Sequence, residues 1–264
     1  KHTKGGHAVD AKTLFDLSEK VAIVAGGSRG IGFAIAEGLA SVGASIVVAN
    51  STPETGERAA AAIRTQGYEA RAIPLDLRDR GSIEQMVSAT LEAFGRIDIL
   101  VNSVGIIRRG PIETVSEEDW DAMMDVNLRG AFLCSQIVGR EMIARAQGKI
   151  INISSNVSQV LQPHRGAYAV TKAGLSHLTR VLALEWAPHH INVNAIAPAP
   201  TITDLNRKFF EDHPEDFKAR TQSIPLGRLG IPQDYVGAAV FLASRASDFV
   251  TGQTYFVDGG SNLI

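Results

Sequence analysis

From Val21 onward, the chain alternates between two hydrophobic patterns. Short runs of consecutive apolar residues are typical of parallel strands buried on both faces, whereas apolar residues that recur every three or four positions are typical of amphipathic helices. The predicted strands are Val21–Ala25, Ser45–Ala49, Ala70–Leu75, Ile97–Val101, Lys149–Ile153, Ile191–Ile196 and Thr254–Val257. The predicted helices are Gly32–Val42, Glu54–Gln66, Ser82–Phe94, Glu117–Arg145, Ala167–Trp186 and Gln233–Ala243.

This alternation predicts an α/β fold, in which a doubly wound, seven-stranded parallel sheet of the Rossmann type carries helices on both faces in a single domain. We expect residues 1–13 to be a disordered or tag-like N-terminus and residues 14–264 to form the domain. The stretch from Pro198 to Pro225 has no regular pattern. It predicts a lid at about 199–224, or alternatively a long surface loop.

Two serines mark the expected starts of helices. Ser82 and Ser116 each precede a predicted helix and are predicted N-caps. Ser116 is followed three residues later by Asp119, a spacing that resembles a capping box.

Composition narrows the possible partners. The chain has 264 residues, 45% of them apolar and 20% charged, which fits one large globular domain. With 26 basic and 28 acidic residues the formal charge is −2, so nothing favours nucleic acid or an anionic membrane as a partner.

Cys134 is the only cysteine, which excludes an internal disulfide and indicates a cytoplasmic location. No spacing of metal ligands is present, so we expect no metal site.

The first predicted strand runs directly into a glycine-rich turn and then a helix. The turn reads Gly26-Gly27-Ser28-Arg29-Gly30-Ile31-Gly32. Glycines allow a sharp bend and a close approach of the backbone to a pyrophosphate, whose charge is favoured by the helix N-terminus. The turn therefore predicts a dinucleotide site formed by Gly26, Ser28, Arg29, Gly30, Ile31 and Gly32.

The end of the second strand bears on the choice of dinucleotide. Enzymes that use NAD usually place a carboxylate there to bind the ribose 2′-hydroxyl, but this chain reads Ala49-Asn50-Ser51-Thr52. Arg29 could pair with a 2′-phosphate. We therefore favour NADP(H) over NAD(H), although Asn50 could also bind a plain ribose and Arg29 could be a solvated surface residue.

Tyr168 and Lys172 lie four residues apart at the start of a predicted helix, so both side chains share one face. A tyrosine hydroxyl has a pKa near 10, and a neighbouring ammonium lowers that pKa toward the range useful for proton transfer. Ser154 and Ser155 end the preceding strand, where the ligand crevice of a doubly wound sheet opens. A serine there can hydrogen-bond a substrate oxygen beside the tyrosine.

Together these residues resemble the short-chain dehydrogenase/reductase family over roughly Phe15 to Gly260. The family's elements occur in order. They are the Gly26/Gly30/Gly32 turn, Asp76, Asn102-Ser-Val-Gly105, Asn127, Ser155, Tyr168 and Lys172. Ser155 precedes Tyr168 by the family's usual thirteen residues and is therefore preferred over Ser154.

The resemblance implies a role for each catalytic residue. Tyr168 is the general acid/base, and Ser155 holds the substrate oxygen. Lys172 binds the nicotinamide ribose and depresses the pKa of Tyr168, while Asn127 positions a water in a proton relay to Lys172. Asp76 contacts the adenine, and the turn from Asn102 to Gly105 walls the adenosine side. Further predicted cofactor-binding residues are Asn50, Ser51, Leu77, Pro198 and Thr203.

Some positions depart from the family pattern. Ala25 replaces a common threonine, and Ser103 and Val104 replace the usual Asn-Ala. Ala199 replaces the glycine of a Pro-Gly turn, which would strain the loop if a positive φ were required there. We expect altered cofactor affinity or loop geometry rather than loss of activity.

Within the family, the chain resembles the sugar-acid dehydrogenases of the gluconate 5-dehydrogenase type, which act on gluconate or 5-ketogluconate. Arg108 and Arg109 could bind a substrate carboxylate, or could be solvated or paired with acids such as Glu113. His164, between Ser155 and Tyr168, is a further candidate near the mouth of the site, as are Gln162 and Arg165.

The alternative activity is that of a 3-oxoacyl-acyl-carrier-protein reductase or another small-carbonyl reductase of the same family. A cofactor-binding protein without turnover is the other class considered, and the complete catalytic set argues against it. The resemblance also implies a homotetramer or homodimer, because the helices 117–145 and 167–186 carry apolar residues on more than one face.

Overall fold

The computed structural model describes residues 10–263 of the chain. At its centre is one seven-stranded sheet in the order β3-β2-β1-β4-β5-β6-β7, in which every neighbouring pair is parallel. The strands are β1 (Val21–Ala25), β2 (Ser45–Asn50), β3 (Ala70–Pro74), β4 (Ile99–Asn102), β5 (Gly148–Ile153), β6 (Ile191–Pro198) and β7 (Thr254–Val257). This confirms the predicted doubly wound Rossmann-type sheet.

The strand β1 lies in the interior of the sheet because all five of its residues are buried and apolar. Ala22 aligns with Ile46 of β2 on one side and with Ile99 of β4 on the other. The chain order reverses between β1 and β4, so the connections leave these two strands in opposite directions. A crevice therefore opens at their carboxyl ends.

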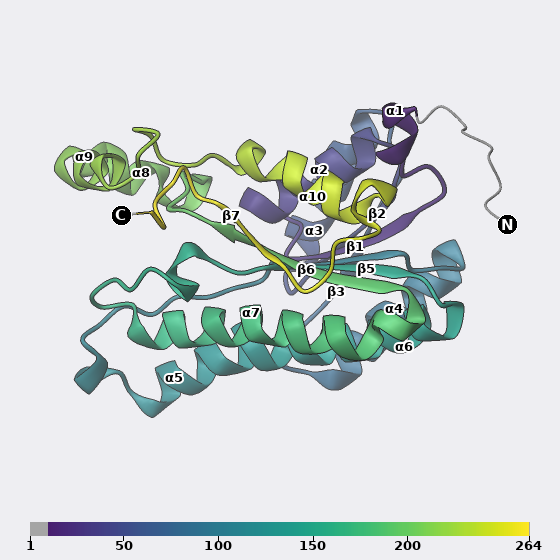
Figure 1. The fold of residues 1–264 in the computed structure, drawn as a ribbon, viewed down its shortest axis with the longest axis horizontal. Helices are drawn as coiled ribbons and strands as arrows, with labels where there is room; N and C mark the ends of the chain where they lie inside the picture. The colour runs from purple at the N-terminus through teal and green to yellow at the C-terminus, as the bar shows by residue number, and fades with distance from the viewer. Residues whose placement is uncertain (1–9, 264) are drawn as a thin grey trace, which may run out of the picture.

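Helices cover both faces of the sheet (Figure 1). One face carries α2 (Gly30–Ser41), α3 (Pro53–Thr65) and α10 (Val236–Ala243). The other carries α4 (Arg80–Phe94), α6 (Gly130–Arg145) and α7 (Gly166–Trp186). Each face buries its own apolar cluster, so the sheet is covered on both sides. Between residues 10 and 263, no helix combines the length and the apolar character that crossing a membrane requires.

The helix predicted over 117–145 is interrupted. It consists of α5 (Glu117–Met124), one π-helical turn, η2 (Asp125–Arg129), and then α6. At the end of this turn Gly130 packs so closely on Leu77 that a Cβ at Gly130 would lie 2.8 Å from the Cβ of Leu77. Sequence periodicity did not reveal this interruption, because one wider turn barely disturbs the apolar pattern.

One predicted N-cap is confirmed and one is wrong. The Ser116 hydroxyl accepts a hydrogen bond from the backbone N–H of Asp119 at 3.1 Å, as expected. The helix α4 instead begins after Asp79, whose carboxylate accepts from the N–H of Gly81. The Ser82 hydroxyl accepts from the N–H of Asp76 at 2.9 Å, so it braces the preceding loop.

The stretch 199–224 is helical rather than irregular, which corrects the prediction. It contains α8 (Asp204–Asp212) and α9 (Pro214–Gln222), which Figure 1 shows at one end of the molecule beside the C-terminus. Pro214 occupies the first turn of α9, where proline is favoured.

Only the last part of the expected N-terminal segment, residues 1–13, can be compared with the structure. Residues 1–9 lie outside the described residues. Residues 11–13 belong to the short helix α1 (Ala11–Leu14), which is capped by the Asp10 carboxylate.

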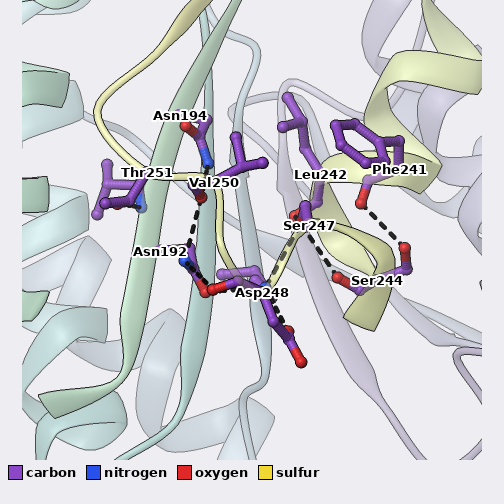
Figure 2. A network of polar contacts seen from close by, with 11 residues as sticks. Asn192, Asn194, Phe241, Leu242, Ser244, Ser247, Asp248, Val250 and Thr251 are labelled. Atoms are coloured by element: carbon purple, nitrogen blue, oxygen red, sulfur yellow. Dashed lines mark hydrogen bonds and ion pairs between the residues drawn. The ribbon is translucent and has the colours of Figure 1, made fainter. Parts of the chain in front are cut away.

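A polar network joins β6 to the segment between α10 and β7 (Figure 2). The side-chain amide of Asn192 donates to the carbonyls of Asp248 and Val250, and that of Asn194 donates to Val250 at 2.9 Å. The Asn194 carbonyl accepts from the N–H of Gln253 at 3.1 Å. These side-chain bonds add to two backbone bonds between the segment and β6, from Gly252 N–H to the Val193 carbonyl and from Ala195 N–H to the Gln253 carbonyl, and together they hold β7 in register.

We expect Asn194→Ala to lower the free energy of unfolding by about 1–2 kcal/mol, because it truncates a buried side chain, leaves the Gln253 N–H without its acceptor and removes one of the two amide donors to the Val250 carbonyl. Urea denaturation followed by circular dichroism measures the change. Gln253→Ala removes an exposed side chain from the same segment and serves as the control. A loss below about 0.5 kcal/mol for Asn194→Ala would show that the network contributes little to stability.

Candidate active site

A cleft of about 1430 Å³ follows the carboxyl edge of the sheet. Because parallel strands all end at this edge, it collects residues from six different strand-to-helix connections. Most of the predicted site residues line it, namely Gly26, Ser28, Arg29, Gly30, Ile31, Gly32, Asn50, Ser51, Asp76, Leu77, Gly105, Arg108, Ser155, Tyr168, Lys172, Pro198 and Thr203. Six predicted residues, Asn102, Asn127, Arg109, Gln162, His164 and Arg165, are not in its lining.

The glycine turn after β1 has the geometry that its residues allow. Gly26 and Gly30 have φ values of +81° and +55°, a region that other residues rarely adopt. At Gly32 a Cβ would overlap the carbonyl oxygen of Gly26. The N-cap of α2, Arg29, makes no capping bond with its side chain, so the first N–H groups of the helix face the cleft without a side-chain acceptor.

At the end of β2, the Asn50 side chain is already engaged. Its amide donates to the carbonyl of Thr52 and to the hydroxyl of Thr55, each at 2.8 Å. Asn50 therefore orders the start of α3 instead of presenting its amide donors to a ligand. Arg58, one turn further along α3, also lines the cleft and is exposed. Sequence reasoning missed Arg58, because its only signal was a cation on the helix that follows the second strand.

Asp76 follows β3 at the same end of the cleft. Its carboxylate accepts from the guanidinium of Arg78 at 2.7 and 3.0 Å and from the Arg78 N–H. These bonds lower the pKa of Asp76, so the carboxylate is charged. Its neighbour Leu77 is buried and forms part of the wall.

The side chain of Asn102, a predicted cofactor contact, is engaged within the protein. It is buried, and its side-chain amide donates to Ser135 at 3.0 Å and to Asn152 at 2.9 Å. Asn102 therefore ties β4 to β5 and α6 beneath the cleft. Of the turn that follows, Ser103, Val104 and Gly105 do line the cleft.

The two serines at the end of β5 play different parts. The Ser154 hydroxyl donates to the backbone carbonyl of Lys172 at 3.1 Å and lies 2.8 Å from the hydroxyl of Ser176. Ser154 thus attaches β5 to α7. Ser155 is only half-buried, and its hydroxyl is close enough to Tyr168 to lower the pKa of that residue.

Lys172 is almost wholly buried, with 3% of its surface exposed. Its ammonium donates to the carbonyl of Ile153 at 2.8 Å and lies 5.8 Å from the centroid of the Tyr168 ring. Burial lowers the pKa of Lys172 to about 8, because the charged form loses hydration.

The pKa of Tyr168 differs from the direction expected from the sequence. Burial raises it above its ordinary value of 10, although Ser155 and Arg165 act in the opposite direction. The Lys172 ammonium was expected to lower this pKa. Instead it is bonded to the Ile153 carbonyl and stands against the tyrosine ring. The protein thus holds Tyr168 as a neutral acid at neutral pH.

Asn127 lies in the π-helical turn η2 and is fully buried. Its side chain accepts from the N–H of Ile106 at 2.8 Å and donates to the Ile106 carbonyl and to Thr171. A Cβ placed on Gly105 would lie 3.3 Å from the Lys172 ammonium and 3.5 Å from the Asn127 carbonyl oxygen. Asn127 and Lys172 therefore meet at Gly105.

The far side of the cleft is formed by the end of β6 and the first turn of α8. Thr203 caps α8, and its methyl group would lie 3.4 Å from a Cβ on Gly30. Ala199 is not among the residues with positive φ, so replacing the usual glycine with alanine strains nothing there.

The predicted substrate residues are only partly brought together. Arg108 lines the cleft and forms an ion pair with Asp119 at 3.2 Å, which is the kind of acidic pairing considered from the sequence but with a different partner from Glu113. Arg109 and His164 are exposed and lie beyond the lining. The carbonyl of His164 accepts a hydrogen bond from Gly110 at 3.1 Å.

Comparison with known proteins identifies the family. A family model described as enoyl-(acyl carrier protein) reductase matches residues 25–262. The gluconate 5-dehydrogenase of Gluconobacter oxydans (strain 621H) is 40% identical over 248 residues, which are 94% of this chain and 96% of that protein. The chain belongs to the short-chain dehydrogenase/reductase family.

Other members differ in cofactor and substrate. The NAD-dependent glycerol dehydrogenase of Listeria innocua serovar 6a is 38% identical over 250 residues, covering 94% of this chain and 96% of that protein. The crystal structure of a gluconate 5-dehydrogenase from Burkholderia cenocepacia J2315 in complex with NADP and tartrate has a TM-score of 0.92 and 40% identity, and covers 97% of this chain and 100% of that chain.

As a short-chain dehydrogenase/reductase, this protein is an NAD(P)-dependent oxidoreductase that acts on CH–OH groups. The cleft fits a dinucleotide, because the glycine turn forms a cradle that a Cβ at Gly32 would fill and the N-terminus of α2 opens into it. No group of three or more His, Cys, Asp or Glu side chains in residues 10–263 is arranged to hold a metal ion.

We expect Gly32→Ala to weaken nucleotide binding at least about tenfold, because the added methyl group overlaps the Gly26 carbonyl and shifts the turn from its cradle geometry. Quenching of tryptophan fluorescence or calorimetry with NADP measures the affinity. Gly237→Ala is the matched control, since a Cβ there meets nothing within 4 Å. Equal affinities for the two variants would mean that the turn does not approach the nucleotide.

Proposed function

We propose that the protein interconverts a secondary alcohol and a ketone on a sugar acid such as gluconate or 5-ketogluconate, with NADP(H) preferred over NAD(H). The observation that carries the proposal is the meeting of Ser155, Tyr168 and Lys172 in a cleft whose other end is the glycine turn. Interconversion of an alcohol and a ketone needs two components: a nicotinamide that accepts or donates hydride, and a group such as tyrosine that transfers the proton.

The proposed catalytic step assigns the proton to Tyr168. When bound, the nicotinamide ring supplies the acceptor or donor of hydride. In oxidation, the Tyr168 phenolate takes the proton of the substrate hydroxyl while the carbon–oxygen bond becomes a carbonyl. In reduction, the Tyr168 hydroxyl returns that proton to the carbonyl oxygen.

Ser155, Lys172 and Asn127 support this proton transfer in the proposal. Ser155 orients the substrate oxygen, because its hydroxyl lies beside that of Tyr168. Lys172, with a pKa of about 8, can release and recover a proton near neutral pH. Asn127 shapes the loop that approaches Lys172, and a water at this position would connect Lys172 to solvent.

The preference for NADP(H) is supported by charge at the adenosine end of the cleft. Arg29 and Arg58 both line it, and no carboxylate follows β2 at Asn50, Ser51 or Thr52. Two guanidinium groups favour a 2′-phosphate over a 2′-hydroxyl.

The substrate class is supported by the relatives named gluconate 5-dehydrogenase, at 40% identity over nearly the full chain. They favour a sugar acid over the alternative, a 3-oxoacyl-acyl-carrier-protein substrate. We propose further that α8 and α9, over 199–224, form a lid on the substrate side of the cleft, since Thr203, Leu205 and Asn206 line it.

We also propose a cytoplasmic homotetramer or homodimer. Phe132 on α6 and Leu184 on α7 are exposed apolar side chains, with 37% and 80% of their surface accessible. Exposed apolar residues on helices that already bury their other face support association with further copies.

The first test is reduction of NADP by D-gluconate, followed at the absorbance of reduced nicotinamide. We expect turnover, and a rate of oxidation that rises over about pH 7 to 9, because the pKa of Tyr168 is raised and its base form grows with pH. Reduction of 5-ketogluconate uses the acid form of Tyr168, so the rate of reduction should not rise over the same pH range.

We expect Tyr168→Phe to reduce kcat about 10²- to 10⁴-fold without loss of NADP binding.

Two results would contradict this proposal. Turnover of acetoacetyl thioester with NADPH, without gluconate activity, would favour the acyl reductase. Full activity of the Tyr168→Phe variant would exclude Tyr168 as the proton donor, and Tyr255→Phe, at a tyrosine on β7 outside the cleft lining, is its control.

The cofactor preference is tested with Arg29→Ala and Arg58→Ala. We expect each variant to raise KM for NADP about tenfold and to leave KM for NAD nearly unchanged, because only NADP carries the 2′-phosphate. Arg64→Ala, on the same helix as Arg58 but outside the cleft lining, is the control. Equal effects on NADP and NAD would show that these arginines do not discriminate between the two.

A further inference from the structure

Three arginines from separate segments gather beside the catalytic tyrosine. Arg109 lies in the loop after β4, Arg165 is the N-cap of α7, and Arg220 lies in the last turn of α9. The first two loops are held side by side, because the N–H of Gly110 donates to the carbonyl of His164 at 3.1 Å. This bond joins the residue after Arg109 to the residue before Arg165.

The three guanidinium groups act on one another. Burial, together with the charges of Arg220 and Arg109, lowers the pKa of Arg165 to about 10. Burial and the charge of Arg109 lower the pKa of Arg220, and Asp216 is the one carboxylate that opposes this shift. Like charges at such positions are unfavourable unless an anion compensates them.

No described carboxylate pairs with any of these three arginines within 4.0 Å. Their neighbour Arg108, by contrast, is paired with Asp119. Arg220 is held over the ring of Phe210, with its guanidinium carbon 5.7 Å from the ring centroid. Packing of Arg220 on Phe210 and the backbone bond between Gly110 and His164 thus position the cluster, and its positive charge remains available to an anion.

The cluster borders the catalytic end of the cleft from outside its lining, which contains Tyr168 but none of the three arginines. Arg165 precedes Tyr168 by three residues, so the two side chains share a face at the start of α7. In agreement with this spacing, the Arg165 charge acts to lower the pKa of Tyr168. An anionic group bound by the cluster would therefore hold the rest of a small substrate near the Tyr168 hydroxyl.

We propose that Arg109, Arg165 and Arg220 form a subsite that binds the carboxylate of an acidic alcohol substrate, in place of the Arg108–Arg109 pair. This inference rests on the proposed function and deepens it, since it selects hydroxy acids over neutral polyols. Because Arg220 comes from α9, the bound carboxylate also links the α8–α9 segment to the loops that carry Arg109 and Arg165. Guanidinium groups suit this task because they bind carboxylates through two parallel hydrogen bonds.

The test uses Arg165→Met and Arg220→Met, which keep much of the side-chain length and remove the charge. Arg180→Met on α7 and Lys218→Met on α9 are controls on the same two helices, and both are exposed. KM and kcat are measured with D-gluconate and NADP, and calorimetry of the NADP-loaded protein with tartrate measures binding without turnover. Thermal melting verifies that each variant is folded.

We expect Arg165→Met and Arg220→Met each to raise KM for gluconate and Kd for tartrate about tenfold to hundredfold, with NADP affinity unchanged. The Arg165→Lys and Arg220→Lys variants should recover part of this loss, because they restore the charge without the planar geometry. The control variants should match the unmodified protein.

The outcomes separate the subsite from the proposed function. If gluconate is oxidised and both Met variants behave like the controls, the subsite is wrong while the proposed function stands. If gluconate is not oxidised but tartrate binding is lost in both Met variants, the subsite stands and the substrate is another hydroxy acid. If the unmodified protein binds neither acid, the subsite is overturned.

Discussion

The attachment of α7 to the end of β5 is the constraint on which the active site depends. The Lys172 ammonium donates to the carbonyl of Ile153, and the Ser154 hydroxyl donates to the carbonyl of Lys172. These two bonds fix the first turns of the helix against the carboxyl end of the strand. Tyr168, one turn before Lys172, is thereby held beside Ser155, so the proton-transferring group and the residue that orients the substrate oxygen come from one rigid junction.

Burial at this junction decides the protonation of the site. The same loss of hydration lowers the pKa of Lys172 to about 8 and raises that of Tyr168 above 10, so Tyr168 is neutral at neutral pH while Lys172 is still mostly charged but gives up its proton just above it. Asn127 contributes indirectly, because its bonds to the backbone of Ile106 bring Gly105 to within reach of Lys172. Small residues at Gly105 and in the turn after β1 are what let the backbone approach these groups so closely.

The segment with α8 and α9 has a different physical character from this junction. Neither helix contains a buried residue. The segment is tied to the domain through the cap formed by Thr203 and Asn206, and through Thr201, whose hydroxyl meets that of Tyr235. Few buried contacts make local opening inexpensive, which suits a segment that borders a substrate site. One edge of the sheet therefore carries both the rigid junction of α7 with β5 and the less tightly packed α8–α9 segment.

The sequence by itself determined the fold class and most of the residues that line the cleft, because hydrophobic periodicity and the glycine turn are local signals. It did not determine which of these side chains already form hydrogen bonds or ion pairs within the protein. Asn102 and Asn50 bond within the protein, and Arg108 is paired, while Arg165 and Arg220 have no carboxylate partner among residues 10–263. The direction of the pKa shift of Tyr168 and the gathering of arginines from three segments were likewise decided only by tertiary structure. Burial and charge–charge distance arise between residues that are far apart in the chain, so no local pattern contains them.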